Sequence, residues 1–185
     1  SDVYKRQSSL CGSDSFGRMM EAEADSRGFF GAEKSSFVGD GLPYNWTIQK
    51  RHFPGFIPVL DFPHVVERAY EAARAVQTNS DEAWACYVNW ATACWKGRVV
   101  DMLEEMRRHQ VRLGRPPKDC DEKDPRKVLA EAITYFENNA SRMDYPRYRT
   151  DGLPITSAYM ESFVKEMNDR VKGTEKFWSD GPSAE

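Results

Sequence analysis

The sequence predicts an α/β fold that is predominantly helical and contains two short strands, each ending in an aspartate. Two apolar runs, "FVGD" and "FIPVLD", stop at Asp40 and Asp61. From Pro63 onward, apolar residues recur at helical spacing. With 185 residues, 40% of them hydrophobic, the chain can bury one core. We therefore expect one domain, or one piece of a larger catalytic domain, and not two independent domains.

Residues 8–62 are expected to form the α/β segment. Met19 to Arg27 has helix-forming composition and is closed by Gly28, after which comes the Phe37-Val38 strand. Residues 44–52 predict a short helix that is broken by "FPG" before the second strand. If the two strands run parallel, their carboxyl ends meet at one sheet edge, and both aspartates lie there. An Asp-Gly pair is also common in plain turns, which is the alternative for Asp40.

Residues 63–150 are expected to form a helical segment. Asp124-Pro125 predicts a helix start, with an N-cap and a proline at the first helical position. "DYPRYRTDGLP" predicts a turn-rich connector, and His52 and His109 are expected on polar helix surfaces. The apolar residues expected to face the core fall into four groups: Val65, Val66, Ala69, Tyr70, Ala73 and Val76; Trp84, Val88, Ala91 and Trp95; Val99, Val100, Leu103 and Met106; and Val128, Leu129, Ala132, Ile133, Phe136 and Ala140.

Residues 151–185 are expected to form a last helix, capped by Thr156 or Ser157. Its positions Glu161, Lys165 and Lys172 share one polar face. From spacing alone, an ordinary solvated face with a Glu-Lys pair is the favoured interpretation.

Composition limits the function classes. Lys and Arg total 26 against 29 acidic residues, so any contact with nucleic acid must be local. The four cysteines lack a C-x-x-C spacing and are typical of reduced thiols in a cytoplasmic protein. The Trp- and Ala-rich run over 85–100 is interrupted by polar residues and cannot span a bilayer, and no signal peptide is recognised. We expect no membrane partner.

Four blocks in order, "GDG", "HFPGFIPVLDFPH", "RMDYPRYRTDGLPITSAYMES" and "RVKGTEKFW", resemble the catalytic core of bacterial insertion-sequence DDE transposases related to the Mutator superfamily. The resemblance runs from about Leu10 to the last residue. It implies a partial ribonuclease H-like fold with a large helical insertion. It also implies metal-dependent DNA cleavage and strand transfer, with transposon ends and target DNA as partners, a homo-oligomer, and a cytoplasmic, nucleoid-associated enzyme.

The resemblance assigns roles to individual residues. Asp40 matches the second acidic residue and Glu161 the third, so both are expected to be catalytic and to bind Mg²⁺ or Mn²⁺. Asp61 and His64 match a supporting acidic-x-x-His signature. Two such ions, roughly 4 Å apart, serve both ends of an in-line displacement at phosphorus, and hard cations prefer carboxylate oxygens. The chain reads "PITSAYME" where relatives usually have a Gly pair before Val-Glu.

The first acidic residue of the family is expected upstream of the segment that begins at Leu10. Residues 1–7, "SDVYKRQ", resemble translated sequencing-adapter sequence or a disordered tail. Asp14 is the nearby acidic candidate, and we expect it to be a loop residue instead. The resemblance thus implies the C-terminal part of a catalytic domain, with weak metal binding and little or no strand transfer by this chain alone.

Basic residues on both sides of the last acidic position are expected to contact DNA phosphates. A solvated basic face is the alternative. Trp84 and Trp95 are expected in the core, and Trp178 is expected to be exposed. The expected DNA-binding residues are Arg142, Arg147, Arg149, Lys165, Arg170 and Lys172.

Two other functions remain open. His52, Asp61 and His64 make a loose two-His, one-carboxylate set that suits iron or zinc. A non-catalytic module, in which aromatic helices mediate self-association, is the second alternative. The first predicts tight binding of a transition metal, and the second predicts that Asp40 and Glu161 are dispensable.

Overall fold

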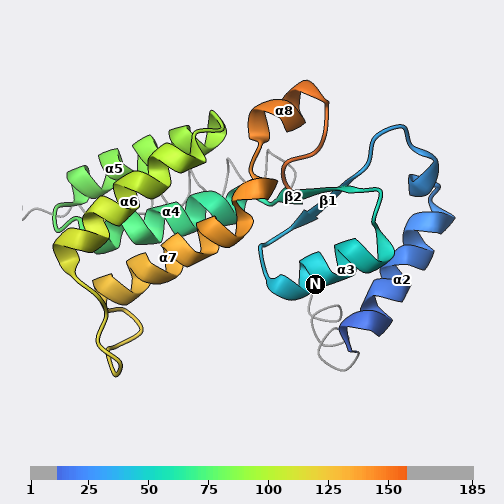
Figure 1. Cartoon of the computed structure of the whole chain (residues 1–185). Helices are drawn as coiled ribbons and strands as arrows, with labels where there is room; N and C mark the ends of the chain where they lie inside the picture. The colour runs from blue at the N-terminus through green and yellow to red at the C-terminus, as the bar shows by residue number, and fades with distance from the viewer. Residues whose placement is uncertain (1–11, 158–185) are drawn as a thin grey trace, which may run out of the picture.

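The computed structural model describes residues 12–157, and Figure 1 shows a small sheet lying between two groups of helices. The α/β segment consists of α2 (Ser13–Ser26), the 3-10 turn η1 (Phe29–Gly31), β1 (Ser36–Gly39), α3 (Pro43–His52) and β2 (Ile57–Leu60). The helical segment consists of α4 (Phe62–Val76), α5 (Ser80–Trp95), α6 (Val99–Leu113), α7 (Pro125–Asn139), the 3-10 turn η2 (Ala140–Arg142) and α8 (Tyr145–Thr150).

The sheet confirms the two predicted strands and the helix between them. β1 and β2 pair in parallel, in a register that sets Ser36 opposite Ile57 and Gly39 opposite Leu60. α3 makes the crossover connection that parallel strands require. Because the strands end at Gly39 and Leu60, the next residue of each is an aspartate, and both follow the same edge of the sheet.

The helical segment confirms the prediction that the chain is mostly helical. α4 packs between α5 and α7, and α6 packs against both α5 and α7. The predicted apolar face of α7 is buried at Leu129, Ala132, Ile133 and Phe136. One continuous cluster of buried side chains joins the sheet to these helices. The structure does not by itself establish a ribonuclease H-like fold, because the described sheet has two strands.

The predicted buried face of α5 was wrong. Trp84 and Val88 are each 43% exposed, whereas Trp90 is completely buried. α5 carries apolar residues nearly all round, so hydrophobic spacing alone does not select a face. The helices that pack on α5, namely α4 and α6, cover a different face from the predicted one. The buried residues of α5 are Ala83, Cys86, Tyr87, Trp90, Ala93 and Cys94. Trp95 is half-buried against Phe62.

Three further apolar or acidic positions differ from the predictions. Val100 is 64% exposed on α6, and Tyr70 lies at the surface of α4. α2 begins at Ser13, six residues before the predicted start, so Asp14 lies in its first turn and not in a loop. There Asp14 forms ion pairs with Arg18 and Arg51.

The connector before Leu153 contains a helix that the sequence analysis missed. In α8, the Asp144 side chain accepts a hydrogen bond from the Arg147 backbone N–H, and a proline occupies the first turn. α7 starts in a similar way, with Asp124 as the N-cap and Pro125 directly after it.

His52 and His109 were predicted at the surface, and both are buried. His52 lies against Gly17 of α2, where an added Cβ would come within 2.4 Å of the imidazole ring. Its Nδ1 is 2.7 Å from a Glu21 carboxylate oxygen. α2 therefore covers a histidine that the sequence of α3 alone leaves exposed.

Among residues 12–157, the helices are too short or too polar to cross a membrane. The predicted tail over 1–7 and the last helix, which carries Glu161, lie outside the described residues. The same holds for Lys165, Arg170, Lys172 and Trp178.

Candidate functional site

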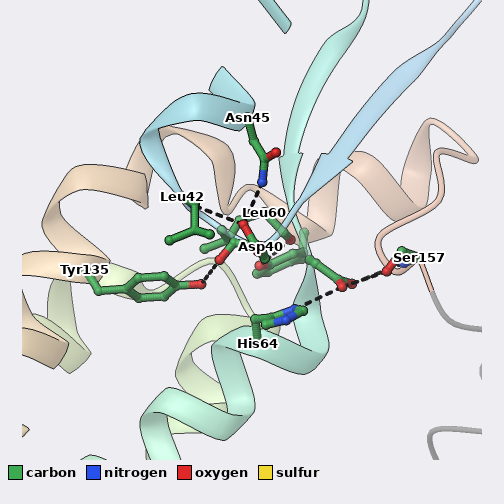
Figure 2. Close-up of polar contacts among 9 residues, drawn as sticks. Asp40, Leu42, Asn45, Leu60, His64, Tyr135 and Ser157 are labelled. Atoms are coloured by element: carbon green, nitrogen blue, oxygen red, sulfur yellow. Dashed lines mark hydrogen bonds and ion pairs between the residues drawn. The ribbon is translucent and has the colours of Figure 1, made fainter. Parts of the chain in front are cut away.

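Asp40 lies at the carboxyl edge of the sheet, where its carboxylate is held by the start of α3. Its Oδ1 accepts hydrogen bonds from the Leu42 backbone N–H at 3.0 Å and from Asn45 Nδ2 at 2.6 Å. Within the described part of the chain, no donor bonds to Oδ2. Hydrogen bonds to Oδ1 thus fix the half-buried carboxylate, and Oδ2 remains available to a ligand (Figure 2).

Asp61 is buried and fully bonded. Its Oδ1 accepts from the Ser157 backbone N–H at 3.1 Å, and its Oδ2 accepts from Ser157 Oγ at 2.8 Å. Oδ2 is also 3.0 Å from His64 Nδ1. Burial raises the pKa of Asp61, but the hydrogen bonds from His64 and Ser157 outweigh it, so the net pKa is lowered. Asp61 is therefore a charged positioning residue that ties α4 to residue 157.

His64 lies one turn into α4, and its side chain is 45% exposed. Because Nδ1 bonds to Asp61, Nε2 is the ring nitrogen left for another partner. The hydrogen bond to Asp61 raises the pKa of His64, and the charge of Asp40 adds to that effect. Figure 2 shows His64 on the same side of the sheet edge as Asp40. The pair of Asp61 and His64 thus places a protonatable imidazole beside Asp40.

We expect His64 to titrate above the ordinary histidine value of about 6.5, as measured by NMR of its ring protons. Asp61→Asn should lower the pKa of His64, since the stronger acceptor is lost. A raised folded-state pKa means that the stabilisation from this pair is complete below about pH 6.5 and is lost as the pH rises through the higher folded value. His109 provides the internal control, because burial and Arg112 lower its pKa. An unchanged His64 titration in Asp61→Asn would contradict the assignment.

Tyr135 and Gly41 fix the backbone around Asp40. The Tyr135 hydroxyl donates to the Asp40 carbonyl oxygen at 3.0 Å, across 95 positions in the sequence. Burial raises the pKa of Tyr135, so the phenol remains a donor at neutral pH. Gly41 has φ +94°, a conformation that side chains other than glycine's rarely adopt. Asp40 and Gly41 therefore do form a turn, and this turn also orients the Asp40 carboxylate.

Of the two aspartates at this sheet edge, Asp40 has a carboxylate oxygen available to a hard divalent cation and Asp61 does not. Asp40 offers a carboxylate oxygen without a described partner, while both oxygens of Asp61 are occupied by hydrogen bonds. Mg²⁺ binds through one or two carboxylates and retains several waters. Asp40 can thus supply one ligand, and the predicted second ligand, Glu161, lies outside the described residues.

A groove of about 710 Å³ runs between α3 and α7 and begins at Gly41, next to Asp40. Arg142 stacks on the Trp46 ring there, with 4.4 Å from its guanidinium carbon to the ring centroid. Lys50 and Lys127 also line the groove. We call this feature the α3–α7 groove. Lys50, Lys127 and Arg142 give the groove positive charges of the kind that contact phosphates, and the acidic Glu131 also lines it.

The other two described basic candidates lie on α8 and not in the groove. Arg149 stacks on Trp95 at 3.8 Å and donates to the Trp95 carbonyl oxygen. Arg147 lies 3.5 Å from the Asp151 carboxylate. Of the predicted DNA contacts, Arg142 is the one that the structure brings near Asp40 through the groove.

The set of His52, Asp61 and His64 is not brought together. His52 bonds to Glu21 on α2, whereas His64 bonds to Asp61. Among the described residues, a single group of three His, Cys, Asp or Glu donors lies within 4.8 Å of one another, and it contains none of these three. The transition-metal alternative built on them is wrong.

The residues that hold the site together were missed by sequence reasoning. Ser157, Asn45 and Tyr135 bond to the two aspartates, and two of them come from more than 90 positions away. Asn45 had a local signal, since an amide five residues after a strand-ending Asp can bond back to it. Ser157 and Tyr135 had none.

Comparison with models of protein families, with curated proteins and with solved structures found no match. The site is therefore interpreted from its own geometry.

Proposed function

We propose that this chain is part of the catalytic core of a DDE-type transposase in which Asp40 is a metal-binding carboxylate. One observation carries the proposal. The in-register pairing of β1 and β2 sets Gly39 opposite Leu60, so that Asp40 and the pair of Asp61 and His64 follow one edge of the sheet. The carboxyl edge of a parallel sheet is where catalytic groups of α/β folds gather.

Each described residue has a distinct role in this proposal. Asn45 and the Leu42 N–H fix Asp40 Oδ1 and leave Oδ2 for the ion. His64, oriented by Asp61 through Nδ1, offers Nε2–H to a phosphate oxygen when its ring is protonated. The α3–α7 groove leads a DNA strand to Asp40 along Lys50, Lys127 and Arg142. When bound, the metal ions activate the attacking water or 3′ hydroxyl and stabilise the charge on the leaving oxygen.

The test is Mn²⁺-dependent nicking and strand transfer on DNA with the element's ends, using the protein expressed from its complete reading frame. Asp40→Asn keeps an oxygen acceptor for Leu42 and Asn45 while removing the charge that the metal requires. We expect Asp40→Asn and Glu161→Ala to lower both activities by at least roughly 100-fold. Asp25→Ala, an exposed aspartate on α2, is the matched control and should retain activity.

Nicking by Asp40→Asn at the unsubstituted rate would sink the site assignment. A second candidate would then gain support, namely self-association through the helices. The observation that favours it is an exposed aromatic cluster in which Trp84 of α5 and Tyr70 of α4 both contact Tyr87. Sedimentation of Trp84→Ala against the unsubstituted chain tests the second function, because loss of an oligomer in this variant is expected only if Trp84 lies in a self-association surface.

A further inference from the structure

Three side chains with different metal-binding atoms meet between α5 and α6, away from Asp40. Cys86 Sγ, a Glu105 carboxylate oxygen and a His109 ring nitrogen all lie within 4.8 Å of one another. Glu105 and His109 are four residues apart and share one face of α6, while Cys86 comes from α5. A short turn joins the two helices, which lie side by side in Figure 1.

We propose that Cys86, Glu105 and His109 form a zinc site that links α5 to α6. Thiolate, imidazole and carboxylate are the three donor types that bind Zn²⁺. With zinc-ligand distances of about 2.0–2.3 Å, neighbouring donors in a tetrahedral site lie roughly 3.5 Å apart. The observed limit of 4.8 Å is therefore close enough to reach that geometry by side-chain rotation. The soft sulfur ligand favours zinc over the Mg²⁺ expected at Asp40.

The surroundings of the three ligands suit this role. Cys86 and His109 are buried, whereas Glu105 is half-buried, so the cluster opens to solvent on one side, where water can be a fourth ligand. Asn89 Nδ2 donates to Glu105 Oε2 at 3.0 Å and orients the carboxylate. The Trp90 ring meets the His109 ring edge to face at 5.8 Å and covers it from solvent.

The protonation states of Cys86 and His109 determine how many protons zinc binding releases. Burial and, to a smaller extent, Glu105 raise the pKa of Cys86 to about 12, so the thiol carries its proton at neutral pH without a metal. Burial and Arg112 lower the pKa of His109, so the imidazole is already neutral. Arg112 Nη2 lies 3.2 Å from His109 Nδ1, leaving Nε2 as the other ring nitrogen. Binding therefore breaks one S–H bond, forms one S–Zn bond and releases one proton to the buffer.

The test is titration of the reduced, metal-free chain with Co²⁺ as a spectroscopic substitute, followed by displacement with Zn²⁺. We expect one equivalent of Co²⁺ to produce a thiolate-to-cobalt charge-transfer band in the near ultraviolet. One proton should be released per metal bound. Cys86→Ser should abolish the band, and Cys120→Ser, which removes a half-buried cysteine outside the cluster, should retain it.

If Cys86→Ser fails to fold, Glu105→Gln still tests the site. This variant is expected to fold, because its amide oxygen can still accept from Asn89 at this half-buried position. It should keep the charge-transfer band and weaken Zn²⁺ binding at least tenfold in competition with a chromophoric chelator. The proposal is overturned if no charge-transfer band forms, if the band survives Cys86→Ser, or if Glu105→Gln binds Zn²⁺ with unchanged affinity. Nicking activity plays no part in this test, so its outcome is independent of the role of Asp40.

Discussion

Gly41→Ala is expected to destabilise the chain by roughly 2–4 kcal/mol and to displace Asp40. The glycine has φ +94°, which an L side chain adopts only with strain. An added Cβ would also lie 2.6 Å from Tyr135 Cε2 and 3.0 Å from Leu60 Cδ1. The Tyr135 ring cannot easily give way, because its hydroxyl bonds to the Asp40 carbonyl oxygen. Urea unfolding followed by circular dichroism measures the loss.

Gly55→Ala is the matched control for Gly41→Ala. A Cβ added at Gly55 meets no atom within 4 Å, and the φ of Gly55 is not positive. The free energy of unfolding of Gly55→Ala should therefore differ from that of the unsubstituted chain by less than about 0.5 kcal/mol. A double-mutant cycle separates strain from collision. In a Tyr135→Ala background the collision with the ring is gone, and Gly41→Ala should cost less than it does alone. Equal costs in both backgrounds would show that Tyr135 does not restrict this turn.

Tyr145→Ala is expected to cost roughly 3–5 kcal/mol of unfolding free energy. Tyr145 is completely buried, and its ring packs edge to face on Phe62 at 4.9 Å between centroids. Its hydroxyl donates to the Leu60 carbonyl oxygen at 2.9 Å, just before Asp61. The side chain therefore connects α8 to the end of β2, and its removal leaves a cavity beside the candidate site.

Tyr145→Phe and Tyr148→Phe divide that cost into packing and hydrogen bonding. Tyr145→Phe keeps the ring and should lose about 1 kcal/mol, the usual net value of one hydrogen bond. Tyr148→Phe should lose less, because its hydroxyl is 3.4 Å from the Pro58 carbonyl oxygen, at the limit of a hydrogen bond. If Tyr145→Phe were as damaging as Tyr145→Ala, the hydroxyl and not the packing would dominate.

Local sequence signals predicted the elements that depend on neighbours in the chain. The helix that starts at Pro125 follows from its capping aspartate and its proline, and the strands follow from short apolar runs. The helix predicted over 44–52 is observed over Pro43–His52 and ends before the "FPG" break. The buried face of α5 did not follow. Trp84 and Trp90 are equally apolar, and only the packing of α4 and α6 determines which one is covered.

The sequence predicted which residues lie at the candidate site, but not which hydrogen bonds they form. The pattern of strand followed by Asp predicted that Asp40 and Asp61 share a sheet edge. It did not predict that His64 and Ser157, the latter 96 positions away, bond to both oxygens of Asp61, whereas among the described residues no donor bonds to Asp40 Oδ2. That difference is the reason why we propose metal binding for Asp40 and a positioning role for Asp61.

The spacing between neighbouring β-strands determines where an acidic residue on an added strand would lie relative to Asp40. Within the described residues β1 pairs with one strand only, so its other edge can pair with an additional strand. Adjacent strands lie about 4.8 Å apart. A carboxylate that follows a strand added beside β1 would thus come within roughly 5 Å of Asp40, close to the ~4 Å separation of paired metal ions. If such a strand pairs with the outer edge of β1, that edge determines the distance between its acidic side chain and Asp40.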